Sequence, residues 1–210
     1  PIPDGYAALN TTAMSPATIA DGSDEFNIVL RNGFGTSGGT VNVGFSPGLL
    51  WEKTRSTSGN HFLYDAVRGA GKILYSNLTN SESTDTDQVN AFTSTGYTLG
   101  TNEWSTSTTL VGWAWKGGAT TVSNDNGSLD SDVRANTSAG FSIVKYTSGS
   151  GSQNDTVGHG LNAVPELILL KRIDGSDPFV VYHKALSTGE YLELNSNTAK
   201  QTSASVFETA

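Results

Sequence analysis

The sequence predicts an all-β fold made of two tandem duplicated β-sandwich modules, the second of which is incomplete. Three observations lead to this prediction. A long segment recurs at a fixed offset, the composition is that of thin, turn-rich β domains, and apolar residues alternate with a period of two. Nowhere do they recur over a useful length at the three-to-four spacing of an amphipathic helix.

The repeat is clearest from residue 47 onward. Residues 47–53 (PGLLWEK) return as residues 165–171 (PELILLK), an offset of 118 residues. Upstream, residues 26–29 match residues 141–144 at an offset of 115. The offset of 118 also relates Tyr64 to Tyr182, Leu74 to Leu192 and Asn77 to Asn195. Repeats of this length indicate duplicated domains, since solenoid units span roughly 20–50 residues.

The second copy lacks the strands with which the first one ends. Segments like 95–100 and 110–115 have no counterpart before Ala210, so we expect the chain to be a segment of a longer polypeptide. The expected organisation is an extended lead-in or linker at 1–25, a first module at 26–118, a connector at 119–140 and a truncated second module at 141–210.

The composition excludes several classes of protein. Hydrophobic residues make up 36% of the chain and charged residues 15%, and there is no cysteine, so neither disulfides nor thiolate chemistry contributes. The net charge of −8 and the scattered basic residues argue against nucleic acid as a partner. No apolar run approaches the roughly 18 residues of a membrane span.

Strands are expected, in chain order, at 26–31, 49–53, 62–65, 72–76, 97–99 and 109–115. The last strand alternates strictly, and we expect the face that carries Trp113 and Trp115 to line the core. Asn32-Gly33 and residues 125–127 are hairpin signals. Residues 65–72 are expected to hold one short helical turn.

Two motifs invite a catalytic or phosphate-binding interpretation. Residues 33–39 are glycine-rich, but they lack the Lys-Ser/Thr pair and the strand–loop–helix context of a phosphate loop. His61 and Asp65 would share one face of a strand, but no nucleophile or oxyanion site accompanies them. The second copy carries Phe179 and His183 at these positions, so a structural role is expected.

Acidic residues offer two further alternatives. Glu52, Glu82, Asp85 and Asp87 include carboxylates that a glycosidase could pair, but three of them lie in a Ser/Thr-rich loop and are expected to be solvated. Residues 124–130 are similar to a calcium loop but lack its terminal bidentate Glu. No catalytic, cofactor-binding or metal-binding residue is therefore assigned.

The tryptophans could form a sugar-stacking platform or fill a β core. Leu169 replaces Trp51 in the second copy, an apolar exchange that favours the core. The four tryptophans are Trp51, Trp104, Trp113 and Trp115.

Several strings of the sequence resemble a known family. They are GFSPGLLWEKTR (44–55), YDAVRG (64–69), KILYSN (72–77), GYTLG (96–100), WAWK (113–116), AGFSIVKY (139–146) and TVGHGL (156–161). Together they resemble structural and tail-fibre-like proteins of marine bacteriophages, including cyanophages, over about residues 4–210. Glu52 departs from the family pattern, where an apolar residue is common.

The resemblance implies a non-enzymatic virion structural protein of a tailed phage. It would be a tail fibre or appendage component for host-surface attachment, acting through many weak contacts. The implied partners are other virion proteins, further copies of the chain in a trimer, and a host-surface polysaccharide or receptor. A capsid decoration protein is the second interpretation, and a carbohydrate-active depolymerase is the third.

Overall fold

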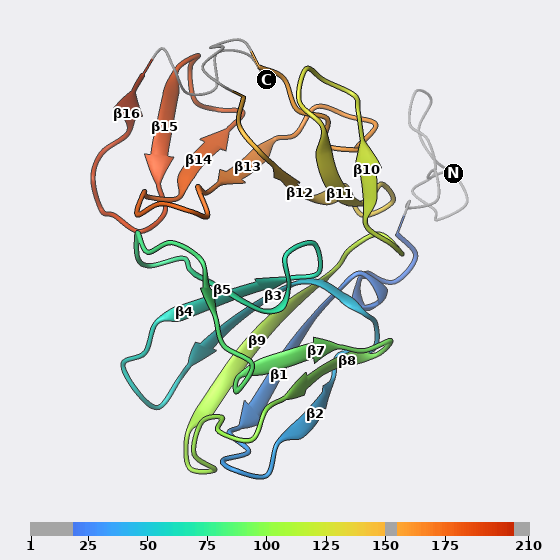
Figure 1. The fold of residues 1–210 in the computed structure, drawn as a ribbon, viewed down its shortest axis with the longest axis vertical. Helices are drawn as coiled ribbons and strands as arrows, with labels where there is room; N and C mark the ends of the chain where they lie inside the picture. Colours follow the sequence, from blue (N-terminus) through green and yellow to red (C-terminus); the bar gives the residue numbers. More distant parts are fainter. Residues whose placement is uncertain (1–18, 150–154, 204–210) are drawn as a thin grey trace, which may run out of the picture.

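The computed structural model of the protein describes residues 19–149 and 155–203 (Figure 1). Within these residues the strands form four antiparallel sheets, with no α-helix and one short 3-10 turn, η2 (Gly22–Asp24). The prediction of an all-β fold is confirmed. The strands are β1 (Phe26–Asn32), β2 (Gly39–Asn42), β3 (Pro47–Thr54), β4 (His61–Asp65), β5 (Gly69–Tyr75), β6 (Ser83–Thr84), β7 (Val89–Phe92), β8 (Gly96–Leu99), β9 (Thr109–Lys116), β10 (Val122–Asn124), β11 (Ser131–Asn136), β12 (Phe141–Tyr146), β13 (Leu167–Leu170), β14 (Val180–His183), β15 (Glu190–Glu193) and β16 (Gln201–Thr202).

The first nine strands form two sheets that share one core (Figure 1). The larger sheet has the order β1-β9-β3-β4-β5-β6. Strand β9 is therefore inserted between β1 and β3, although it is the last of the nine strands in the chain. The smaller sheet has the order β2-β8-β7. Buried side chains from both sheets, including Leu50, Tyr64 and Tyr97, pack between them, and this shared core holds the two layers together.

Strand β9 turns its small residues toward this core. Leu110 and Ala114 are fully buried, and a side chain at Gly112 would meet atoms of Val29 and Tyr97 at 3.1 and 3.3 Å. Trp113 and Trp115 therefore lie on the opposite, outer face of the larger sheet and are only half-buried. The sequence-based assignment of the tryptophan face to the core was wrong, because the tight approach of the smaller sheet leaves no room for indole rings.

The remaining strands, β10 to β16, form a three-stranded sheet β10-β11-β12 and a four-stranded sheet β13-β14-β15-β16. The segment 119–140, expected as a connector, contains β10 and β11, joined by the turn that residues 125–127 predicted. Counterparts of β2, β7, β8 and β9 are not seen among residues 141–149 and 155–203. The described part of this half is therefore layered differently from the first nine strands.

The four-stranded sheet repeats the pairing of β3-β4-β5-β6 at the same offset of 118 residues. Leu49 pairs with Asp65 and Leu167 with His183, and every recorded pair of the second sheet has its counterpart in the first. Backbone hydrogen bonds outside the ladders repeat as well: the Ala66 N–H donates to the Gly48 carbonyl as the Lys184 N–H does to the Glu166 carbonyl. Residues 49–53 and 167–171 thus begin equivalent four-stranded meanders.

Two local predictions were wrong for identifiable reasons. Asn32-Gly33 does not join a hairpin, because β1 pairs with β9 and β2 with β8. The glycine is instead needed for space, since the Trp104 backbone passes against it. The expected helical turn after β4 is a tight hairpin turn, in which the Asp65 carboxylate accepts the N–H groups of Val67 and Arg68 and Gly69 takes a φ of 106°.

A second apolar cluster joins the two halves of the molecule. Leu63 and Leu74, on the outer face of β4 and β5, are buried against Phe179, which precedes β14. Leu49, Trp51, Ile173 and Leu194 pack around this cluster. The backbone N–H of Glu82 also donates to the Ile173 carbonyl at 2.7 Å. The second meander therefore covers one end of the outer face of the larger sheet.

A buried ion network ties three strands and two loops together. The Arg31 guanidinium contacts Glu52 at 3.0 Å and Glu103 at 2.8 Å, with side-chain exposures of 6%, 3% and 0% in that order. The Tyr97 hydroxyl donates to Glu52 at 2.6 Å, and the Phe34 N–H donates to Glu103. Burial alone would lower the pKa of Arg31, but the two carboxylates outweigh it and raise the pKa, so the guanidinium stays charged.

Removing the cation should be costly, because two buried carboxylates would lose their counter-charge. We expect Arg31→Met to lower the free energy of unfolding by about 3–5 kcal/mol, measured by urea denaturation. Arg172 also contacts two carboxylates but is exposed, so Arg172→Met should leave the unfolding midpoint nearly unchanged. If Arg31→Met lowered the free energy of unfolding as little as Arg172→Met, the buried network would add nothing to stability.

Candidate functional site

The outer face of the larger sheet carries a row of aromatic and aliphatic side chains, here called the aromatic face. It is defined by Phe26, Ile28 and Leu30 on β1, Val111, Trp113 and Trp115 on β9, and Leu49 and Trp51 on β3. Ladder pairing sets these residues beside one another: Ile28 lies opposite Trp113, which lies opposite Trp51. The rings of Trp51 and Trp113 meet edge to face, with centroids 6.4 Å apart.

Only part of the aromatic face is covered. The cluster around Phe179 shields Leu49 and Trp51, whereas Ile28 and Leu30 are 51% and 62% exposed. Exposed aliphatic side chains beside half-buried indole rings indicate a contact surface. Phe179→Ala should uncover more of it, because Phe179 is 4% exposed at the centre of the covering cluster.

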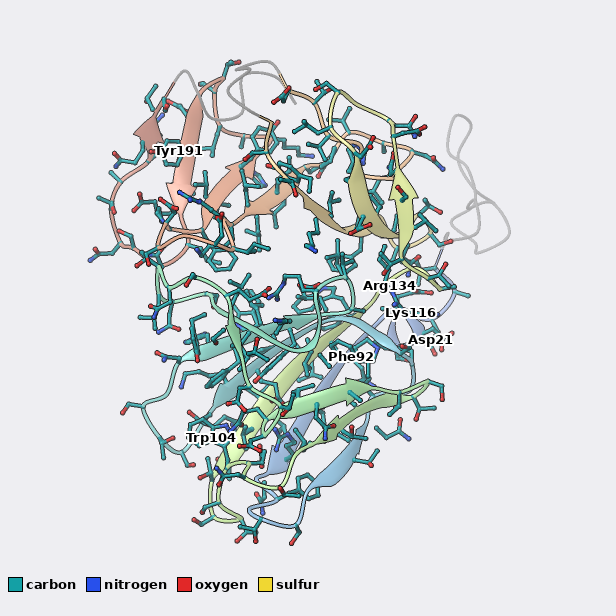
Figure 2. All side chains as sticks on the ribbon, in the orientation of Figure 1. Asp21, Phe92, Trp104, Lys116, Arg134 and Tyr191 are labelled. Carbon is teal, nitrogen blue, oxygen red and sulfur yellow. The ribbon has the colours of Figure 1, made fainter. Side chains whose placement is uncertain are left out.

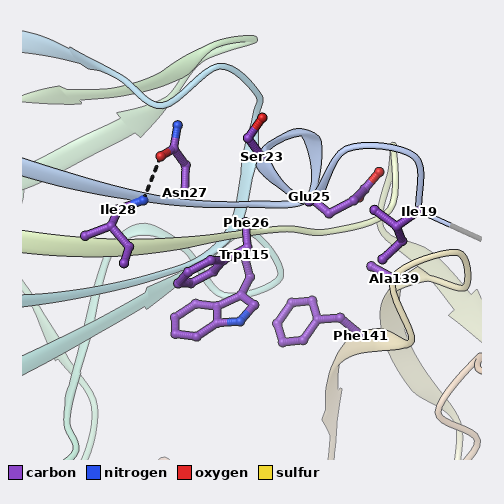
Figure 3. Close-up of a pocket in the computed structure, with 10 residues that line it drawn as sticks. Ile19, Ser23, Glu25, Phe26, Asn27, Ile28, Trp115, Ala139 and Phe141 are labelled. Carbon is purple, nitrogen blue, oxygen red and sulfur yellow. Dashed lines mark hydrogen bonds between the residues drawn. The ribbon is translucent and has the colours of Figure 1, made fainter. Parts of the chain in front are cut away.

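An open pocket of about 630 Å³ lies at the β1 end of this face (Figure 3). Its floor is aromatic: Trp115 lies between Phe26, at a centroid distance of 4.9 Å, and Phe141 of β12, at 6.4 Å and nearly parallel. Ile19 and Ile28 extend the apolar lining. Residues from both halves of the molecule thus form one concave surface.

The rim of the pocket carries fixed polar groups. Glu25 lies at an ion-pair distance of 3.3 Å from Lys116 and accepts a hydrogen bond from the Asn136 side chain. Ser23 and Asn27 also line the opening. An aromatic floor with an anchored carboxylate and amide at its edge is suited to a ring-bearing polar ligand, including a sugar.

The neighbourhood of this pocket is held in place by side chains at the junction of the two halves. Arg134 of β11 donates from Nε to the Gly118 carbonyl at 2.8 Å and packs against Gly117, next to Lys116 (Figure 2). Trp104 is not part of the site, because its ring packs against Phe62 on the core side.

The structure does not bring His61 and Asp65 together as a pair. His61 has its ring against Trp51, and burial together with Lys53 lowers its pKa. The Asp65 carboxylate instead binds Arg68 at 2.5 Å and the hairpin turn. Each group has a structural partner of its own, and no hydrogen bond joins them.

The other sequence candidates lie apart from the aromatic face. Residues 33–38 link two strands, so the glycine-rich loop has no helix after it. Glu52 is buried in the ion network, and Glu82 contacts Arg68. In the described residues, 124–130 included, no group of three or more His, Cys, Asp or Glu side chains is arranged to hold a metal ion.

Sequence reasoning missed the pocket because its residues are distant in the chain. Phe26 and Phe141 occupy matching positions of the two copies, at the offset of 115, yet in space both pack on Trp115. The pairing of Phe26 with Trp115 in the β1–β9 ladder was the missing information. No signal in a single sequence joins the first strand of the fold to the ninth.

The fold and the site define an all-β protein with an open, largely apolar pocket on one sheet face. The chain belongs to the family described as a domain of unknown function (DUF7483), which matches residues 21–210. No curated protein and no solved structure matches the chain. Within the described residues no helix is long and apolar enough to cross a membrane.

The cover over the aromatic face should be energetically important. We expect Phe179→Ala to lower the free energy of unfolding by about 3–5 kcal/mol, the range for large-to-small changes in a core. Leu192→Ala, on the same sheet but at a side chain 38% exposed, should cost about 1 kcal/mol or less. Chemical denaturation measures both. A small loss for Phe179→Ala would show that the two halves do not stabilise each other through this cluster.

Proposed function

We propose that the protein is a non-enzymatic structural component of a tailed-phage virion, in a tail fibre or appendage, and that it attaches the particle to the host surface. The repeated meander carries the proposal, because two meanders with one register indicate tandem duplication of a β module. The motif resemblance to phage fibre-like proteins supplies the setting. We further propose that the chain acts as a homo-oligomer, a trimer as in many phage fibres.

Attachment would use the aromatic pocket. Trp115 and Phe141 offer flat rings on which the apolar face of a sugar can stack, and the Glu25 carboxylate lines the opening, where it could accept from a hydroxyl group. One such contact is weak. Several copies in an oligomer would raise the effective affinity without any new contact. A host-surface polysaccharide, with its repeated units, suits this mode of binding.

Absence of catalysis is also part of the proposal. His61 and Asp65, the pair that the sequence offered for catalysis, each have a separate structural partner: Trp51 for His61 and Arg68 for Asp65. Capsid decoration remains the second candidate, since the same modules could bind the head surface. Immunogold labelling of phage particles that encode the protein separates the two: label on fibres supports attachment, and label confined to heads supports decoration. Particles without any label would contradict both.

Polysaccharide retention tests the attachment site. We expect Phe141→Ala to weaken binding of the oligomeric protein to host-surface polysaccharide by about tenfold, because one stacking partner is lost. Tyr146→Ala, at the exposed far end of the same strand, is the matched control and should bind normally. Surface plasmon resonance on immobilised polysaccharide measures both. Unchanged binding by Phe141→Ala would place the ligand elsewhere.

Incubation with the same polysaccharide should release no saccharide, as measured by reducing-end analysis. The reason is that neither His61 nor Asp65 is free to act on a substrate together with the other. Saccharide release that disappears in His61→Ala would instead establish the depolymerase function.

A further inference from the structure

The first strand of the second meander, β13, has an open edge where its counterpart β3 has a partner. Strand β3 is paired on one side with β4 and on the other with β9. Strand β13 is paired with β14, and its opposite edge has no ladder partner in the described part of the chain. The two strands otherwise share their register residue by residue, so the open edge is the position that β9 fills in the first half.

The open edge carries no charge, proline or bulge within β13 itself, although the strand is short. Natural edge strands are commonly blocked by charges, proline or bulges. All four residues of β13 are aliphatic, and no bulge interrupts its ladder with β14. Leu167 and Leu169 are 57% and 39% exposed, whereas their counterparts Leu49 and Trp51 are half-buried beside β9 and the covering cluster. Both the backbone groups and the side chains of β13 are therefore available.

We propose that β13 is an acceptor for one antiparallel β-strand, donated by a partner polypeptide whose sequence alternates as β9 does. The β3–β9 ladder specifies the donor: Trp113 and Trp115 lie opposite Trp51 and Leu49 on the outer face, and Ala114 lies opposite Leu50 on the core face. A donor on β13 would place large apolar side chains over Leu167 and Leu169. Small residues would lie over Ile168 and Leu170.

This strand-acceptor site goes beyond attachment to the host and does not depend on it. Addition of a strand to a sheet edge gives affinity through main-chain hydrogen bonds and specificity through alternate side chains. In an assembled particle, a strand from one polypeptide would pair with the β13 edge of its neighbour and so join the two. The aromatic pocket is formed by β1, β9 and β12 and takes no part in it.

A labelled peptide of residues 107–118, which contains β9, tests the proposal with the intact chain. We expect one peptide to bind per chain, measured by fluorescence anisotropy. Hydrogen exchange should slow at Leu167 and Leu169, whose N–H groups face the open edge because the Glu166 carbonyl faces β14.

A peptide N-methylated at Val111 and Trp113 should bind at least about tenfold more weakly. The odd-numbered residues of β9 face β3, as the Thr109 carbonyl does when it accepts from the Arg55 N–H, and a methylated nitrogen, like that of proline, cannot donate a ladder hydrogen bond. In a further peptide, Gly112 changes places with Trp113 and Ala114 with Trp115. This peptide keeps the composition but moves the large side chains to the opposite face of the strand, and it should bind as weakly.

Two chain variants locate the site. Leu169→Lys sets a charge on the open edge and should abolish binding of the peptide. Leu192→Lys adds the same charge at a side chain of equal exposure on β15, which is paired on both sides, and should bind the peptide normally. Absence of peptide binding, binding without protection of Leu167 and Leu169, or equal loss in both variants would overturn the proposal. So would protection of β13 by self-association of the chain alone, detected by sedimentation, because a second copy would then hold the edge.

Discussion

The insertion of β9 between β1 and β3 is the constraint on which the rest of the structure depends. Strand β9 completes the larger sheet by pairing with β1, from which it is separated by about eighty residues in the sequence. Its core face has to be small, because Tyr97 and Leu50 approach Gly112 closely. Its outer face is free to be large and supplies both Trp113 and Trp115. One strand thus determines the packing of the core and the character of the candidate binding surface.

The buried ion network is the second consequence of that closure. Glu52 lies on the core face of β3, where an apolar residue would be expected, and it is 2% exposed. The residue is tolerated because Arg31 reaches it from β1, across β9, and Tyr97 donates to it from the other sheet. Buried charges of this kind stabilise little when complete and cost much when broken, so they specify which strands belong together.

The sequence allowed the strands with strong periodicity to be predicted, and the reasons for the failures are physical. Expected strands at β1, β3, β4, β5, β8 and β9 are all present. Strand β6, with two residues, is too short to show a period, and it forms only because β5 pairs with it. The face of β9 was misassigned because alternation shows that two faces exist but does not say which one another sheet covers. The pocket was not predictable for a related reason: it depends on contacts between the two halves.

The divergence of the two meanders follows their partners. At the position of Glu52 the second meander has Leu170. At the position of Arg31, using the offset of 115, the second copy has Tyr146 of β12, so both charges are gone together. The ion pair of Lys72 with Glu82 is retained with its sense reversed, as Glu190 with Lys200. Lys53 and Lys171 donate to the carbonyls of equivalent residues, Thr54 and Arg172. These two interactions contained within the meander are therefore preserved, even when the charges exchange places. The ion pair of Asp65 with Arg68 is not, because its counterparts are His183 and Leu186. The contacts of Glu52 that reach outside the meander, to Arg31 of β1 and Tyr97 of β8, have no equivalent at the apolar Leu170.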